Sequence, residues 1–272
     1  MRRALSFPCE GATLVGTLDD APGQAGLLIV SGGNEIRSGA HRGMAELAAT
    51  IATKGYPVFR FDRRGIGDSE GDNRGFRWSG PDIAAALAVF GAECPHLARV
   101  VAFGNCDAAT ALALHGTPVD ARVLANPWVI PSSGEMPPPA AIKDRYARRL
   151  RDPEAWKALL AGKIDMGKLA KGLGRLAAAK PATPDSLADK TVRALEASRI
   201  PTTILLATGD ATAIAFADVW RGDPAIAVER IETTSHSFAD AAAYVRLVAV
   251  LEGALAEPSG DTVFGVPFDA RR

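Results

Sequence analysis

Short apolar runs alternate along the chain with longer stretches dense in small and apolar residues. Continuous runs rich in β-branched residues are typical of strands buried on both faces of a sheet, and stretches dense in Ala and Leu favour helices. The expected buried strands are Leu27–Val30, Pro57–Phe61, Val100–Phe103, Arg122–Val129, Thr202–Ala207 and Ala225–Ile231. The expected helices are Met44–Lys54, Asp82–Phe90, Ala108–Leu114, a helix through Phe216–Trp220, and Ala239–Leu255.

This alternation of strands and helices predicts an α/β fold with a mostly parallel, doubly wound sheet. Two shorter segments near the N-terminus, Ala4–Phe7 and Thr13–Leu18, are separated by Glu10-Gly11. They predict a small antiparallel hairpin that precedes the parallel strands.

The alternating pattern breaks between Pro131 and Arg199. Three consecutive prolines stand at 137–139, and the sequence after them has helical character. An insertion at this edge of a parallel sheet lies where ligands bind, and it is typical of a lid. We therefore expect a core of residues 1–130 and 200–256, a helical lid at residues 131–199 and a C-terminal tail at residues 257–272.

The charge of the chain is balanced overall but not locally. The 31 Lys and Arg residues match the 31 Asp and Glu residues, so nothing global points to nucleic acid or an anionic membrane. Residues 140–199, however, contain 14 Lys or Arg and 7 Asp or Glu. Such an excess beside a pocket favours an anionic substrate, against the alternative that these charges form a solvated helical face.

Cysteine usage and the N-terminus bear on the compartment. The 3 cysteines include no CxxC pair and no His/Cys spacing suited to zinc, and an odd number favours a reducing environment. The first ten residues lack the apolar core of a signal peptide, and no segment reaches the roughly 18 consecutive apolar residues of a membrane span. We therefore expect a cytoplasmic protein without a metal or another cofactor.

The stretch RVVAFGNCDAATALALHG, residues 99–116, carries the main functional signal. It reads as a buried strand, a sharp turn and a helix, with Gly104 and Ala108 two positions before and after Cys106. This layout is typical of the nucleophile elbow of the α/β-hydrolase fold, with cysteine in place of the usual serine. A helix N-terminus favours the reactive thiolate. We therefore interpret Cys106 as the nucleophile, against the alternative of a small buried hydrophobic residue.

An α/β-hydrolase needs an acid after a later strand and a histidine after the last one, in the chain order nucleophile, acid, histidine. Asp210 stands just after the strand Thr202–Ala207, and His236 stands just beyond the final strand. We therefore expect a Cys106, His236, Asp210 triad. The alternative role for Asp210 is a helix cap. The competing acids and histidines, which fit the order or position less well, are Asp218, Asp240, His41, His96 and His115.

The oxyanion that forms during acyl transfer needs two N–H donors aimed at it. One is expected to be the backbone N–H of Asp107, the residue after the nucleophile. The other is expected from the turn after Leu27–Val30, where Gly33 is the first choice and Asn34 the second. The residues that we expect to bind the substrate are Arg37, His41 and Trp128.

A glycine-rich loop, Asp62–Gly71, follows the second buried strand. A loop of this kind invites a phosphate-binding interpretation. It has neither the GxxxxGK[ST] nor the GxGxxG pattern, however, so we set nucleotide binding aside.

On these motifs, the chain resembles the α/β-hydrolases associated with the exosortase A system, type 1. The matching stretches are SGGNEIRSGAHR, GYPVFRFDRRGIGDSEG, FGNCDAATALAL, NPWV, YARRLRDPEAWKALLAGKIDM, TGDATAIAF and SHSF. The resemblance implies a cytoplasmic bacterial hydrolase encoded near exopolysaccharide and protein-sorting genes, with an ester or thioester substrate. It also implies that Cys106, Asp210 and His236 form the triad. The chain departs from the group at Asn34.

The sequence therefore predicts a metal-free cysteine hydrolase that works through a thioester acyl-enzyme on a small acyl substrate. The same site would be an acyltransferase if an amine or a sugar hydroxyl replaced water. A lactone hydrolase similar to dienelactone hydrolase is another alternative, although the large basic lid argues against it. A catalytically silent binding protein with this fold is the alternative from another class. The sequence leaves open whether the tail docks on its own chain or on a second subunit of a homodimer.

Overall fold

The computed structural model describes residues 1–130 and 185–257. Residues 131–184 and 258–272 lie outside the described part of the chain. Most of the expected lid and nearly all of the expected tail therefore fall outside the described residues, together with the whole local excess of positive charge.

The described strands form one eight-stranded sheet in the order β1-β2-β4-β3-β5-β6-β7-β8. The antiparallel hairpin of β1 and β2 joins the sheet through β4, and the strands from β4 to β8 are parallel. This arrangement confirms the expected α/β fold and its N-terminal hairpin. The strands are β1 (Arg2–Cys9), β2 (Ala12–Asp19), β3 (Ala25–Val30), β4 (Val58–Phe61), β5 (Arg99–Asn105), β6 (Ala121–Ala125), β7 (Thr202–Ala207) and β8 (Ala227–Ile231).

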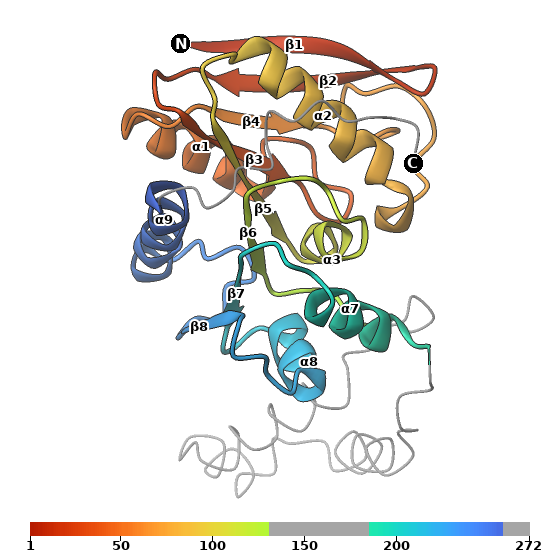
Figure 1. Ribbon diagram of the computed structural model, residues 1–272, viewed down its shortest axis with the longest axis vertical. Coiled ribbons are helices and arrows are strands. Elements are labelled where there is room, and N and C mark those ends of the chain that lie inside the picture. Colours follow the sequence, from red (N-terminus) through yellow and green to blue (C-terminus); the bar gives the residue numbers. More distant parts are fainter. Residues whose placement is uncertain (131–184, 258–272) are drawn as a thin grey trace, which may run out of the picture.

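Helices cover both faces of this sheet, as Figure 1 shows. One core cluster contains side chains of α1 and α9, whereas the other contains side chains of α2, α3, α7 and α8. The helical segments are η1 (Ala40–Arg42), α1 (Gly43–Thr53), η2 (Phe76–Trp78), α2 (Gly80–Glu93), α3 (Asp107–Leu114), α7 (Leu187–Glu196), α8 (Ala211–Val219) and α9 (Ala241–Ala256).

The continuous apolar runs of the central strands reflect burial on both faces. Successive side chains of a strand point to opposite faces of its sheet. On β3, accordingly, Leu28 lies in the core cluster of α2 and α3, whereas Leu27 and Ile29 lie in the cluster of α1 and α9. On β5, Val101 and Phe103 likewise lie on the α1 and α9 side, opposite Ala102. Every position of these strands therefore packs against a helix layer.

The expected strand Arg122–Val129 is shorter in the structure, because β6 ends at Ala125. The next residue, Asn126, has a positive φ of 43°, which is uncommon for a residue other than glycine. Pro127 then lacks the N–H that a strand ladder requires. The chain therefore turns at the carboxyl edge of the sheet, where it leaves the side chain of Asn126 buried.

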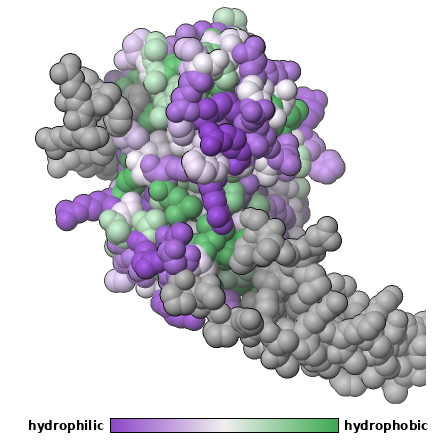
Figure 2. Space-filling model, turned by 90° about the vertical axis from the view of Figure 1, so that its right-hand side faces the viewer, coloured by the Kyte–Doolittle hydropathy of each residue, from purple (hydrophilic) through white to green (hydrophobic). Residues whose placement is uncertain are grey.

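The surface of the described residues is not uniformly polar. From the side of the molecule that lies to the right in Figure 1, hydrophobic surface is visible at mid-height below a hydrophilic region (Figure 2). Among the described residues, no helix combines the length and the apolar character that crossing a membrane requires.

Candidate active site

The turn between β5 and α3 holds Cys106 in a strained backbone conformation, with φ 63° and ψ −127°. Non-glycine residues rarely adopt such angles, and they do so where the surrounding structure fixes them. The backbone N–H of Cys106 donates to the carbonyl of Ala125 at 3.0 Å, and its carbonyl accepts from Trp128 at 3.2 Å. The last residue of β6 and the turn after it therefore hold the elbow on both sides of the cysteine.

The glycine two residues before Cys106 is required by the close approach of the helix. A Cβ atom at Gly104 would lie 2.8 Å from the backbone carbon of Ala108 and 2.9 Å from its carbonyl oxygen. Neither backbone atom can move without shifting the start of α3. Gly104 therefore allows β5 and α3 to meet at the sharp angle that the elbow needs.

Replacement of Gly104 by alanine is accordingly expected to destabilise the protein by about 1–3 kcal/mol, the usual range for an overpacked site, and to displace Cys106. Urea unfolding measures the first effect, and the rate of Cys106 alkylation the second. Gly253 in α9 is a matched control, because a Cβ there meets nothing within 4 Å. Its replacement by alanine should stabilise the protein by about 0.5–1 kcal/mol. Equal effects of the two substitutions would contradict the packing argument.

The structure brings His236 and Asp210 together at the carboxyl edge of the sheet. The Nδ1 atom of His236 lies 3.0 Å from Oδ2 of Asp210. The other carboxylate oxygen of Asp210 caps α8, where it accepts from the backbone N–H groups of Thr212 and Ala213, each at 3.0 Å. Although burial opposes it, the hydrogen bond with His236 lowers the pKa of Asp210 below its ordinary value. The carboxylate therefore stays ionised beside the imidazole.

The second partner of His236 is Cys106. Burial disfavours the charged imidazole, but the interactions with Asp210 and with Cys106 outweigh burial and raise the pKa of His236 to about 10. The histidine side chain is 38% exposed, so the group that links the acid and the thiol is open to solvent. The structure thus brings together the three residues that the sequence predicts as a triad.

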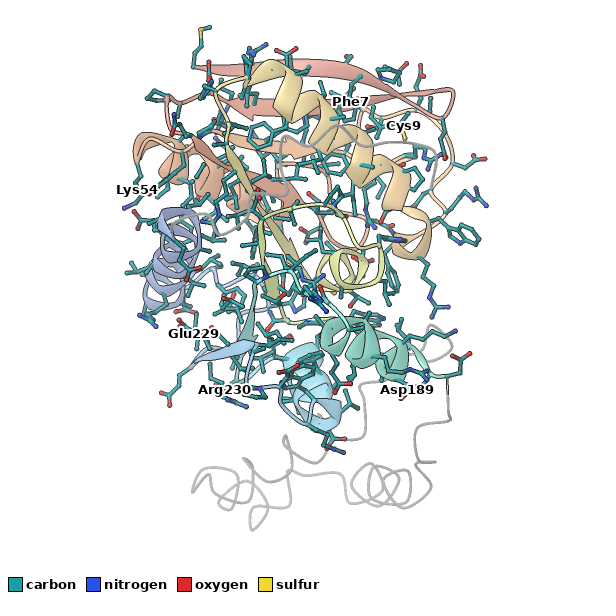
Figure 3. All side chains as sticks on the ribbon, in the orientation of Figure 1. Phe7, Cys9, Lys54, Asp189, Glu229 and Arg230 are labelled. Atoms are coloured by element: carbon teal, nitrogen blue, oxygen red, sulfur yellow. The ribbon has the colours of Figure 1, made fainter. Side chains whose placement is uncertain are left out.

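The other two cysteines have a different environment. Cys9 and Cys94 are buried, whereas Cys106 is half-buried. Figure 3 shows Cys9 on the edge strand β1 beside α2, where its Sγ lies 3.5 Å from the carboxylate of Asp82. Burial raises the pKa of both thiols to about 11, and Asp82 adds to the effect at Cys9. Both therefore remain protonated at neutral pH, when a thiolate is the reactive form.

Two carboxamides that the sequence interpretation missed hold the loop of His236. The side chains of Asn105 and Asn126 both donate to the backbone carbonyl of His236, each at 3.0 Å. Asn126 also accepts from the backbone N–H of Ala207 at 2.9 Å and donates to Oδ1 of Asn105 at 3.2 Å. The signal that could have identified them is one asparagine at the end of each of two neighbouring strands.

The turn after β3 approaches the elbow closely. A Cβ atom at Gly32 would lie 2.4 Å from the carbonyl oxygen of Asn105. The backbone N–H of Gly33 donates to Oδ1 of Asp107 at 2.6 Å. As the first residue of α3, Asp107 has a backbone N–H without an intrahelical acceptor. The structure therefore places both expected oxyanion donors beside Cys106, with one of them bonded to the Asp107 carboxylate. The side chain of Asn34 accepts from Asn73 at 2.8 Å.

Behind this turn lies the buried guanidinium of Arg63, whose side chain is 4% exposed. Its Nη2 atom donates to the carbonyl of Gly33 and lies 3.8 Å from Oδ1 of Asp107. Arg63 follows β4, so three separate segments meet at one point: the loop after β3, the loop after β4 and the start of α3. The sequence interpretation assigned no role to this arginine.

Arg37, expected to bind substrate, is engaged by residues of β2 and of the glycine-rich loop after β4. Its guanidinium bonds to Asp62, lies 2.8 Å from Asp68 and donates to Thr17 at 3.0 Å. A Cβ atom at Gly67 would lie 2.3 Å from the carboxylate of Asp62, so this glycine makes room for the buried acid. The glycine-rich loop after β4 therefore folds around an ion pair.

The other two expected substrate residues lie in different surroundings. Trp128 is half-buried and directly next to the elbow, since its backbone N–H donates to Cys106 and its carbonyl accepts from Thr110 at 2.7 Å. His41 is exposed and has a positive φ of 51° within η1. Trp128 thus lies beside the elbow, whereas His41 lies on the exposed segment η1.

Comparison with known proteins identifies relatives at the level of family and fold. The sequence matches the alpha/beta hydrolase family over residues 27–250. The structure is similar to the Pyrococcus furiosus esterase Pf2001, with 14% identity, a TM-score of 0.59, and coverage of 93% of this chain and 92% of that chain. The structure is also similar to the alpha/beta hydrolase GrgF from Penicillium sp. sh18, with 17% identity, a TM-score of 0.60, and coverage of 94% of this chain and 100% of that chain. The thioesterase domain from the curacin biosynthetic pathway has 12% identity to this chain and a TM-score of 0.52, with coverage of 94% of this chain and 100% of that chain. A search of curated proteins found no match.

Proposed function

The chain belongs to the alpha/beta hydrolase family, and from this premise we propose that it cleaves an ester or thioester bond with Cys106 as nucleophile. His236 is the general base and acid, and Asp210 orients its imidazole. The observation that carries the proposal is the position of His236, whose Nδ1 atom lies 3.0 Å from Asp210 and whose pKa is raised by both Asp210 and Cys106. A thiol, an imidazole and a carboxylate in this series are the groups that acyl transfer through a thioester needs.

In the first half of the reaction, the Sγ atom of Cys106 attacks the acyl carbon while His236 holds the thiol proton. A carbon–sulfur bond forms, and the carbonyl electrons move onto the oxygen. When the tetrahedral intermediate collapses, the bond to the leaving alcohol or thiol breaks, and His236 protonates that group. Cys106 is left as a thioester. Asp210 fixes the tautomer of His236 and stabilises its charged form.

In the second half, His236 removes a proton from water, and the resulting hydroxyl oxygen attacks the thioester carbon. Collapse of this intermediate breaks the carbon–sulfur bond, returns the proton to sulfur and releases the acid. The oxyanion of each intermediate accepts from the backbone N–H of Asp107 and from that of Gly33. Trp128, which contacts the elbow through its backbone, and His41 are the proposed substrate contacts. Arg37 is instead a positioning residue, because its guanidinium is bonded to Asp62, Asp68 and Thr17.

The substitution Asp210→Asn separates the electrostatic role of this residue from its capping role. Asparagine caps helices about as well as aspartate, so the stability of α8 should be retained. The anionic partner of His236 is lost, and kcat should fall roughly 10²–10⁴-fold, the range that general acid–base catalysis contributes. Steady-state kinetics and thermal unfolding measure the two effects. Asp240, which caps α9 by accepting from Ala243 at 2.9 Å, is the matched control. A similar loss of activity in Asp240→Asn would contradict the assignment.

The proposal is tested by trapping the acyl-enzyme. The protein is mixed with p-nitrophenyl acetate or with an acetyl thioester of N-acetylcysteamine, quenched in acid and examined by peptide mass spectrometry. We expect one acetyl group on the peptide that contains Cys106, together with product release that iodoacetamide prevents. Turnover without this adduct, or turnover that survives alkylation of Cys106, would contradict a cysteine mechanism.

The same experiment separates the competing functions. An acyltransferase would give an amide or a new ester when an amine or a sugar hydroxyl is added. A silent binding protein would show no turnover and no rapid, pH-dependent alkylation of its thiols. The structural neighbours described as an esterase and a thioesterase share the fold with this chain, which is consistent with hydrolysis.

We also propose that the chain is a type 1 hydrolase of the exosortase A system, located in the cytoplasm and acting on a small anionic acyl compound. The elbow with Cys106-Asp107 and the run SHSF support the subtype, and the excess of Lys and Arg in residues 140–199 supports the anionic substrate. A panel of acyl compounds with and without a carboxylate group tests the charge preference. We expect a lower KM for the charged members.

A further inference from the structure

One of the two proposed oxyanion donors already has an acceptor. The backbone N–H of Gly33 donates to Oδ1 of Asp107 at 2.6 Å. Asp107, the residue that follows the nucleophile, therefore contributes two groups to the proposed oxyanion hole. Its backbone N–H is a donor for the oxyanion, whereas its carboxylate takes the hydrogen bond that the oxyanion needs from Gly33.

A carboxylate at this position opposes the reaction in two ways. The substrate oxygen cannot receive the hydrogen bond of Gly33 while Oδ1 holds it. The negative charge of Asp107 also lies where the charge of the tetrahedral intermediate develops, and like charges at short distance repel each other. The contact in the structure is therefore incompatible with a fully formed oxyanion hole.

The structure offers Asp107 a second partner. The Nη2 atom of Arg63 lies 3.8 Å from the same carboxylate oxygen, and the guanidinium is almost fully buried. Among the described residues, the Nε atom of Arg63 has no hydrogen-bond partner. A small rotation of the Asp107 side chain toward this buried cation would release Gly33 and replace a neutral donor by a charged one. A hydrogen bond to the guanidinium adds the attraction between two opposite charges, so the released position is not costly.

We propose that the Asp107 carboxylate is a positioning element that closes the oxyanion hole at rest and moves to Arg63 when substrate binds. This inference rests on the proposed function. It implies selectivity, because only a substrate with enough binding energy displaces the carboxylate from Gly33. Small activated esters such as p-nitrophenyl acetate bind few other groups of the site and should be acylating agents of low efficiency.

Two reactions of the same sulfur atom separate this role from a general effect on the thiol. In acylation by p-nitrophenyl acetate, a carbon–sulfur bond forms, nitrophenolate leaves, and an oxyanion forms on the way. In alkylation by iodoacetamide, a carbon–sulfur bond forms and iodide leaves without any oxyanion. A change in the thiolate fraction alters both rates equally. The ratio of the acylation rate to the alkylation rate therefore reports the oxyanion hole alone.

We expect Asp107→Ser to raise this ratio roughly tenfold or more, since one oxyanion donor contributes about 10²–10³ to acyl transfer. Asp107→Asn, which keeps an oxygen acceptor but loses the charge, should give a smaller increase. The control is Asp189→Ser, which removes a carboxylate from the first turn of α7 and should leave the ratio unchanged. Thermal unfolding verifies that each variant is folded, and two variants of different size keep the test valid if one is not.

The outcomes distinguish this inference from the proposed function. A ratio that stays the same or falls in both Asp107 variants, with Cys106 still acylated, would overturn the closing role alone. A fall would show that Asp107 supports the turn at Gly33. Rapid alkylation with no acylation in the wild type or in any variant would overturn the proposed function, and this inference with it. Acylation of Asp107→Ser but not of the wild type would support the inference in its strongest form.

Discussion

Replacement of Cys106 by alanine is expected to abolish ester and thioester hydrolysis and leave the protein folded. Without sulfur there is no atom to form the acyl-enzyme, and the loss in kcat should be at least about 10³-fold, as for other nucleophiles that act within a triad. The fold should survive, because Gly104 and the strand ends that hold the elbow are unchanged. Steady-state kinetics on an ester and on a thioester, with circular dichroism as a check of folding, measure both effects.

Cys94→Ala is the matched control for this substitution. It removes a thiol that is buried at the end of α2, so it should lower stability slightly and leave kcat within about twofold of the wild type. If Cys106→Ala retained wild-type turnover, the cysteine mechanism would be wrong. Loss of activity in Cys94→Ala with normal folding would point instead to a second reactive thiol.

Replacement of His236 by alanine is expected to change the pH dependence of Cys106 alkylation. In the wild type, the imidazole of His236, held by Asp210, is the neighbouring base that takes the thiol proton. Without the imidazole the thiol loses this base, so alkylation at pH 7 should slow roughly tenfold or more. Stopped-flow labelling between pH 5 and about 9.5 gives both profiles.

The same substitution has a consequence for stability. A histidine with a raised pKa in the folded state contributes stability that is fully present below its unfolded pKa and is lost as the pH rises through its folded pKa. For His236 that loss spans the range from about 6.5, its ordinary value, to about 10. The difference in melting temperature between wild type and His236→Ala should therefore shrink as the pH rises through this range. His96→Gln, at a histidine that contacts the carbonyl of Ala21, should leave the alkylation of Cys106 unchanged.

The sequence was most informative where a feature depends on neighbours along the chain. The strand Thr202–Ala207 has the predicted bounds, because a short apolar run followed by turn residues is compatible with few structures other than a buried strand. The elbow follows in the same way from small residues around Cys106. The order of Cys106, Asp210 and His236 could be predicted because a parallel sheet brings the carboxyl ends of its strands to one edge.

The features that were not predicted depend on which distant segments meet. Gly33 and Asp107 are 74 residues apart, and Asn126 and His236 are 110 residues apart. Such contacts cannot be predicted from the local sequence. A polar residue at the end of a strand is typical of a loop, whether or not its side chain hydrogen-bonds to a distant residue. Arg37 illustrates the same limit, since the sequence does not show that Asp62 and Asp68 lie beside its guanidinium in the folded chain.

The strained backbone of residue 106 has a wider consequence. Its φ and ψ angles are fixed by the ladder that ends at β6 and by the tight start of α3, and neither depends on which atom follows Cβ. The protein thus determines where a reactive atom will stand separately from what that atom is. In such a fold, one codon change can replace the cysteine by serine and leave the surrounding contacts in place. The chemistry of the nucleophile can therefore change in evolution while the fold stays the same.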